Sequence, residues 1–214
     1  MRKKHTEPIQ PETYYHVYNR GINGESIFKE ACNYNYFLEK YAQYINPIAD
    51  TYAYCLLNNH FHFLIRTCSA EVIISDRVLN PVRDRDNNFS AEIDFSKTIG
   101  KQFSKLFNSY SQSINKAYGR TGSLFDRPFR RIPVQNDHYF SRLVSYIHKN
   151  PEKHGFTDDF KDYPYSSYWS HLDSRKTRLK REEVIKWFGD QSCYQEFHVL
   201  GSEDDDLSKF IIEV

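Results

Sequence analysis

With 214 residues, the chain can bury a full hydrophobic core and fits one domain with an elaboration, or two small domains. Aromatic residues make up 16% of the sequence and can provide stacking surfaces for unpaired bases as well as packing. The four cysteines form no C-x-x-C pair, which argues against a zinc knuckle or a disulfide framework. No stretch approaches the length of a membrane span. We therefore expect a cytoplasmic protein with reduced thiols and no membrane partner.

The first half of the chain carries signals for three strands and one helix. After a polar tail over residues 1–12, the sequence predicts a strand at 14–18, a helix at 30–45, a strand at 51–57 and a strand at 60–66. Asn58 and Asn59 are expected to form the tight turn between the last two strands.

Residues 69–98 differ in character, because they have mixed charge and only short apolar runs, and we expect an insertion or a loop there. The chain then predicts a helix at 103–118 and a bent strand or short hairpin at 124–134 that is interrupted at Pro128. A helix is predicted at 137–150, capped by Asn136 or Asp137 and terminated by Pro151 and Gly155. We expect residues 161–214 to form a C-terminal extension with a helix at 182–188.

The element order β-α-β-β-α-β-α predicts an α+β fold, with one antiparallel sheet and helices on one of its faces. Side chains of a strand alternate between the two faces of a sheet. Phe61 and Phe63 are therefore expected on the core face, and His60 and His62 on the other face. That second face is left for a ligand or for a further helix.

Two imidazoles on adjacent positions of one strand face can bind one divalent metal ion. From these residues alone, two half-exposed histidines without a metal are equally expected. Tyr146 and Asn150 favour the metal hypothesis, because their spacing of four residues puts a phenol and an amide oxygen on one side of a helix. Such ligands suit Mg²⁺ or Mn²⁺, which polarise phosphate oxygens. Tyr146 is then the natural nucleophile.

The net charge of +1 conceals a basic segment. Between residues 101 and 131, seven basic residues accompany one acidic residue, Asp126. A local basic surface on a near-neutral protein indicates a defined polyanion site, and the alternative is a solvated helix face.

Four segments of the chain resemble, in the same order, the HUH (histidine-hydrophobe-histidine) single-tyrosine transposases of the IS200 type. The resemblance is to the branch associated with repetitive extragenic palindromes (REPs) in particular. The segments are YHVYNRG at 15–21, LNNHFHFL at 57–64, GSLFDRPF at 122–129 and YIHKNP at 146–151.

The resemblance implies an RRM-like (ferredoxin-like) core over residues 13–160 that cleaves and joins single-stranded DNA with a 5′-phosphotyrosine intermediate. DNA hairpins are the implied recognition element, and the nucleoid is the implied place of action. His60 and His62 match the metal ligands, Asn150 a third polar ligand, and Tyr146 the nucleophile. The candidate DNA contacts are Arg20, Lys101, Lys105, Arg127, Arg130 and Arg131. Monomer or homodimer stays open.

Two other functions stay open as well. A nucleic-acid-binding regulator without catalysis could use the same sheet, but it has no need for both histidines together with Tyr146 and Asn150. A metal-dependent hydrolase that activates water would leave Tyr146 idle. Among neighbouring residues, Tyr139 is a less favoured nucleophile, His148 is expected to be exposed, and His16 is expected to serve strand packing.

Overall fold

The computed structural model describes residues 7–75, 93–134 and 138–200, and within them four strands form one antiparallel sheet in the order β2-β3-β1-β4. The strands are β1 (Tyr14–Arg20), β2 (Ala49–Leu56), β3 (His60–Thr67) and β4 (Arg130–Pro133). β1 runs two residues beyond the predicted strand, because Asn19 and Arg20 still pair with β3.

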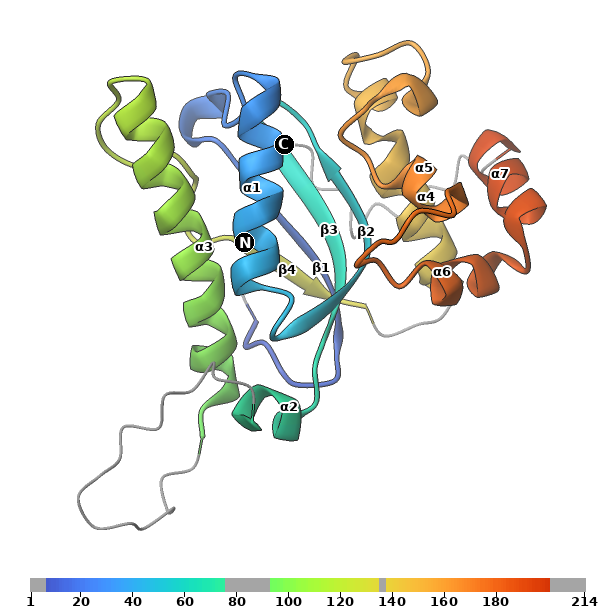
Figure 1. Ribbon diagram of the computed structural model, residues 1–214, viewed down its shortest axis with the longest axis horizontal. Helices are drawn as coiled ribbons and strands as arrows, with labels where there is room; N and C mark the ends of the chain where they lie inside the picture. Colours follow the sequence, from blue (N-terminus) through green and yellow to red (C-terminus); the bar gives the residue numbers. More distant parts are fainter. Residues whose placement is uncertain (1–6, 76–92, 135–137, 201–214) are drawn as a thin grey trace, which may run out of the picture.

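Two helices, α1 (Ala31–Tyr44) and α3 (Phe95–Ala117), cover one face of this sheet (Figure 1). Each starts at a residue whose side chain satisfies free backbone donors. Glu30 and Asn33 form a capping box at the start of α1, and Asp94 accepts the N–H of Lys97 at 3.0 Å at the start of α3. The capping by Asp94 explains why α3 begins eight residues before the predicted helix at 103–118.

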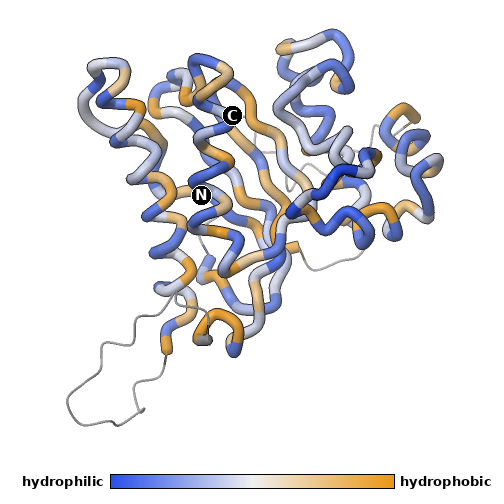
Figure 2. The backbone as a smooth tube through the Cα atoms, viewed as in Figure 1, coloured by the Kyte–Doolittle hydropathy of each residue, from blue (hydrophilic) through white to orange (hydrophobic). Residues whose placement is uncertain are grey.

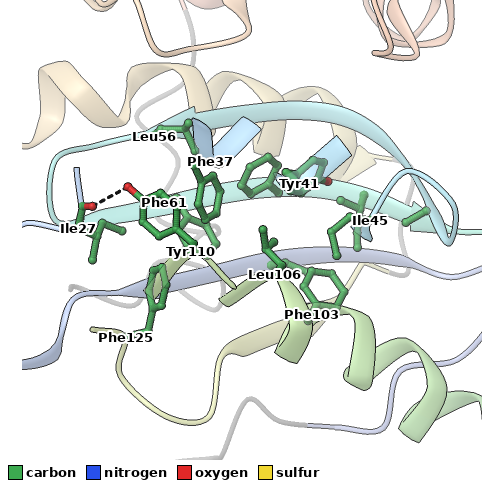
Figure 3. Close-up of a cluster of buried hydrophobic side chains, with 14 of the residues drawn as sticks. Ile27, Phe37, Tyr41, Ile45, Leu56, Phe61, Phe103, Leu106, Tyr110 and Phe125 are labelled. Atoms are coloured by element: carbon green, nitrogen blue, oxygen red, sulfur yellow. Dashed lines mark hydrogen bonds between the residues drawn. The ribbon is translucent and has the colours of Figure 1, made fainter. Parts of the chain in front are cut away.

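The main hydrophobic core lies between these helices and the sheet. Figure 3 shows Phe37 from α1 beside Phe61 of β3, with Phe103 and Leu106 of α3 on the same side of the sheet. The buried Tyr110 hydroxyl donates to the carbonyl of Ile27 at 2.8 Å, so its polar end is satisfied as well. The predicted core face of β3 is therefore confirmed.

A second layer of helices covers the opposite face of the sheet (Figure 1). The first of them, α4 (His138–Lys153), packs Leu143, Val144 and Ile147 against Leu64 of β3. A 3-10 helix (Phe160–Asp162), α5 (Tyr168–Leu172), α6 (Arg181–Phe188) and α7 (Gln191–Leu200) follow it. The histidine face is therefore the one that a further helix covers.

Three predictions on element boundaries need correction or fall outside the described residues. A short helix, α2 (Ala70–Ser75), and the start of α3 lie inside the expected insertion at 69–98, of which residues 76–92 are not described. In the region 124–134, only Arg130–Pro133 form a strand, which lies after the predicted interruption at Pro128. The expected caps Asn136 and Asp137 lie outside the described residues.

Hydrophobic residues concentrate in the strands, and hydrophilic ones on the outer sides of the helices (Figure 2). No helix in the described ranges combines the length and the apolar character needed to cross a membrane.

Candidate active site

β3 holds the two histidines of the LNNHFHFL segment beneath α4. His60 and His62 are 2% and 1% exposed, and their ring centres are 5.2 Å apart. Their shared orientation follows from strand alternation, as predicted, but both rings are buried rather than half-exposed, because α4 lies over them.

Each of these imidazoles has one engaged nitrogen and one free nitrogen. His60 Nδ1 lies 2.7 Å from Asn59 Oδ1, and His62 Nδ1 lies 3.0 Å from His16 Nε2. The Nε2 atoms of His60 and His62 are buried and have no hydrogen-bond partner. When Nδ1 carries the hydrogen and donates it, Nε2 keeps a lone pair, which is the form that binds a metal.

Burial also keeps these rings uncharged. Desolvation, with a smaller contribution from the neighbouring His154, lowers the pKa of His60 to about 3, and Asn150 opposes this shift. Desolvation likewise holds the pKa of His62 well below its ordinary value. Neutral imidazole is the ligating species, so burial keeps both rings in the form that can bind a metal ion.

α4 brings Tyr146 and Asn150 to the same place. The Asn150 Nδ2 group donates to the carbonyl of Tyr146 at 2.9 Å, which leaves its Oδ1 atom buried and without a hydrogen-bond partner. The Tyr146 ring meets the His62 ring edge-on, with 5.8 Å between the ring centres. Burial raises the pKa of Tyr146, and the amide of Asn150 opposes that rise.

Of the two predicted helix terminators, Pro151 does not end α4, and the helix ends shortly before Gly155. Proline disfavours helical geometry in the residue before it, yet α4 continues through Pro151 to Lys153 and keeps Asn150 within the helix. The His154 N–H bonds to the Asn150 carbonyl at 3.0 Å, so the last turn is closed in spite of the proline. Asn150 therefore stays one helical turn from Tyr146.

Two residues of β1 complete the site, and sequence reasoning did not assign them to it. His16 is not only strand packing, because it bonds His62. Tyr18 stacks on His62 with 5.8 Å between ring centres, and its buried hydroxyl has no hydrogen-bond partner. Burial raises the pKa of Tyr18 to about 12, so the hydroxyl remains a donor. The alternation in YHVYNRG was the available signal, but it needed the pairing of β1 with β3.

The predicted DNA contacts separate into two groups. Arg20 and Arg130 each place a nitrogen 3.5 Å from the Asp126 carboxylate, and the Arg130 guanidinium lies 6.0 Å from the Tyr18 ring centre. Arg131 Nε donates to the Glu7 carbonyl at 2.5 Å. The others lie on or near α3: Lys101 and Arg127 line a groove there, and Lys105 is an exposed residue of the helix.

The expectation that His148 is exposed is wrong. It is fully buried, with Nδ1 2.9 Å from His198 Nε2 and Nε2 2.7 Å from the Ser167 hydroxyl. The C-terminal helices cover this side of α4, and a single-sequence reading does not place them there. Tyr139, seven residues before Tyr146 on α4, is half-buried against the apolar cluster between α4 and the sheet.

The donor set fits a divalent ion that prefers nitrogen and oxygen ligands. Within the described residues, no group of three or more His, Cys, Asp or Glu side chains could hold a metal ion, so a third protein ligand would have to come from Asn150. His60 Nε2, His62 Nε2 and Asn150 Oδ1 are all buried without hydrogen-bond partners. Such groups are costly unless something binds them, and an ion such as Mg²⁺ or Mn²⁺ would do so.

Two known proteins are similar to this chain, one in sequence and one in fold. No family model matches the chain. The chain is 26% identical over 146 residues to a putative REP-associated tyrosine transposase of Haemophilus influenzae, and the match covers 67% of this chain and 65% of that relative. A solved structure described as a REP-associated tyrosine transposase bound to a REP hairpin superposes with a TM-score of 0.52 at 14% identity, covering 78% of this chain and 82% of that one. The solved structure shows the α+β fold, and the predicted resemblance to the REP-associated tyrosine transposases is confirmed.

Proposed function

We propose that this protein cleaves and rejoins single-stranded DNA at hairpins, with Tyr146 as the nucleophile. The supporting observation is the meeting of three buried, unpartnered ligand atoms, from His60, His62 and Asn150, beside the Tyr146 ring. Neither a regulator without catalysis nor a water-activating hydrolase needs a phenol at that point. Residues 13–160 would be the catalytic unit, residues 161–214 an extension, and the nucleoid the place of action.

The chemistry is a phosphoryl exchange. The Tyr146 oxygen forms a bond to phosphorus, the bond from phosphorus to the 3′ oxygen breaks, and the released 3′ hydroxyl carries the proton that the phenol loses. The product is a 5′-phosphotyrosine, which conserves the bond energy, so a second 3′ hydroxyl can reverse the step without ATP. A bound Mg²⁺ or Mn²⁺ would supply Lewis-acid polarisation of the phosphate.

The protein's own residues position the reactants. Tyr146 is half-buried beside His62, and this partial cover restricts the access of water to a phosphotyrosine. The Asn150 side chain donates a hydrogen bond to the backbone carbonyl of Tyr146, and it opposes the rise in the pKa of the Tyr146 phenol. Arg130, beside Tyr18, lies where a phosphate entering the site would need a positive charge.

The direct test is formation of a covalent adduct. The protein is incubated with a 5′-labelled and a 3′-labelled single-stranded DNA hairpin and Mn²⁺, then denatured and separated on a gel. We expect a denaturation-resistant adduct that carries the label on the 3′ side of the cut, since the 5′ phosphate of that fragment is joined to tyrosine. Cutting without an adduct would favour water activation, and binding without cutting would favour the regulator.

A first variant addresses the buried Tyr18 hydroxyl. We infer that it donates a hydrogen bond to the phosphate in the transition state, so Tyr18→Phe should slow adduct formation roughly 10- to 100-fold. Hairpin affinity should not change. Since the hydroxyl has no partner in the protein, its removal should leave the melting temperature unchanged or higher. If Tyr18→Phe formed the adduct at the unaltered rate, the role of Tyr18 would be packing alone.

A second variant addresses the two arginines that contact Asp126. Replacing Arg20 and Arg130 by Ala should weaken hairpin binding and make the affinity less dependent on salt. On single-stranded DNA, each lost phosphate contact should reduce the slope of log affinity against log salt concentration by about 0.7. The double variant Arg175→Ala, Arg178→Ala in the C-terminal extension is the matched control, because both are exposed there. Equal slopes in the two double variants would assign Arg20 and Arg130 to the solvated surface.

A further inference from the structure

Three polar side chains follow one another along a single face of α4. Tyr146, Asn150 and Lys153 are spaced by four and three residues, and residues at that spacing lie on the same side of a helix. Tyr146 and Asn150 belong to the site already described, whereas Lys153 has no role in the chemistry proposed above. Lys153 belongs to this face only because α4 continues past Pro151.

The ammonium group of Lys153 lies at the active site. Its Nζ atom is over the Tyr146 ring, 5.6 Å from the ring centre. Its charge also acts on His62, because desolvation is the main cause of the low pKa of His62 and the charge of Lys153 adds to it. A positive charge therefore lies beside both the proposed nucleophile and one of the proposed metal ligands.

No carboxylate in the described part of the chain neutralises this charge. Within residues 7–75, 93–134 and 138–200, Lys153 takes part in no ion pair. The carboxylate of the adjacent Glu152 accepts the backbone N–H of Phe160 at 3.2 Å instead. Lys153 is exposed, and a lysine side chain is flexible, so its ammonium can approach an incoming anion.

Two ordinary structural roles are the alternatives for Lys153. A basic residue in the last turn of a helix compensates the negative end of the helix dipole. A cation over an aromatic ring is attracted to the face of the ring. Both roles act on the folded protein alone, so both would affect every DNA substrate to the same extent. This difference makes them separable from a role in the reaction.

The proposed reaction creates a charge that this cation can stabilise. A phosphodiester carries one negative charge, which its two nonbridging oxygens share. Attack by the Tyr146 oxygen, with loss of the phenol proton, brings a second negative charge onto the phosphate in the transition state. A cation beside these oxygens therefore stabilises the transition state more than the bound substrate, and such a difference increases the rate.

We propose that Lys153 is a further catalytic residue, which binds one nonbridging oxygen of the scissile phosphate and stabilises the charge that develops there. The inference rests on the proposed function for the reaction itself. An ion held by His60, His62 and Asn150 would polarise the other nonbridging oxygen. The proposal also gives a purpose to the helical turn beyond Pro151, since that turn brings Lys153 to Tyr146.

The test compares Lys153→Met and Lys153→Arg with the unaltered protein. Methionine keeps an unbranched side chain but loses the charge, and arginine keeps the charge. Lys149→Met is the matched control, because it removes the same group from the same helix. Lys149 lies near His198 of α7 instead, where its charge adds to desolvation in lowering the pKa of His198. The rate of adduct formation is measured in Mn²⁺ at saturating hairpin DNA, so that differences in affinity do not enter.

Each protein receives three versions of the hairpin, which differ at the cleavage site that the adduct assay locates. One has the natural phosphate, and the other two are the methylphosphonate stereoisomers, each with one nonbridging oxygen replaced by an uncharged methyl group. On the natural phosphate, Lys153→Met should slow adduct formation by about 10-fold or more. This is less than the roughly 100-fold cost of losing a buried donor, because water and salt screen an exposed charge. Lys153→Arg should recover most of the rate, and Lys149→Met should match the unaltered protein.

One stereoisomer lacks the oxygen that Lys153 binds, and on it Lys153→Met and the unaltered protein should form adduct at nearly equal rates. A role in helix stability or in orienting the Tyr146 ring would instead slow Lys153→Met by the same factor on every hairpin that the unaltered protein cuts. That result would overturn the inference, and so would an unchanged rate on the natural phosphate. Adduct formation by the unaltered protein reports separately on the proposed function: without it both proposals fail, and with it the Lys153 variants decide only the inference.

Discussion

Tyr146→Phe is expected to abolish both DNA cleavage and the covalent adduct, while folding and hairpin binding survive. The substitution removes one oxygen and keeps the ring that meets His62. Phenylalanine cannot attack phosphorus, and the nucleophilic oxygen is the only atom that the substitution removes. The loss should therefore be complete within the sensitivity of a gel assay. The same gel, with anisotropy for binding, measures both outcomes.

Tyr139→Phe is the matched control for this change, because it removes the same oxygen from the same helix at a half-buried position outside the histidine site. We expect it to form the adduct at the normal rate. If the Tyr146→Phe protein still formed the adduct, the nucleophile would have to be another tyrosine. A Tyr146→Phe protein that cuts without adduct would instead support water activation. If the unaltered protein did not cut DNA, the remaining hypothesis would be a nucleic-acid-binding regulator without catalysis.

Local periodicity was sufficient for the parts of the site that lie on one element. Alternation along β3 puts His60 and His62 on one face and Phe61 on the other, and a spacing of four places Tyr146 and Asn150 together on α4. Both patterns are properties of a single strand or helix, so they do not depend on where the rest of the chain lies. These are the features that the sequence analysis predicted correctly.

What the sequence could not provide is the packing of distant segments. Tyr18 joins the site because β1 pairs with β3, with Tyr18 opposite His62. His148 is buried because α7 brings His198 to it across 50 positions of sequence. The groove depends on residues 123–129 lying against a stripe of α3 that has no apolar signal of its own. Each of these contacts is long-range, and none leaves a pattern in one sequence.

Removal of the divalent ion is expected to have the other large effect. EDTA should stop cleavage by the unaltered protein, and His60→Ala or His62→Ala should stop it in Mn²⁺, because the ion would lose one of three buried ligands. His16→Ala should act differently. It removes only the residue that orients His62, so cleavage should persist but need roughly 10- to 100-fold more Mn²⁺.

A measurement independent of catalysis decides whether those histidines hold the ion. Mn²⁺ binding to the folded state alone should raise the melting temperature of the unaltered protein, with a stabilisation of about 2.7 kcal/mol at one hundred times the dissociation constant. His60→Ala should remain folded, as judged by circular dichroism, since the lost ring carries a nitrogen without a partner, and its melting temperature should no longer respond to Mn²⁺. Cleavage that persists in EDTA, or a His60→Ala protein whose melting temperature still rises with Mn²⁺, would exclude this metal site and leave the three unpartnered atoms to contact the DNA directly.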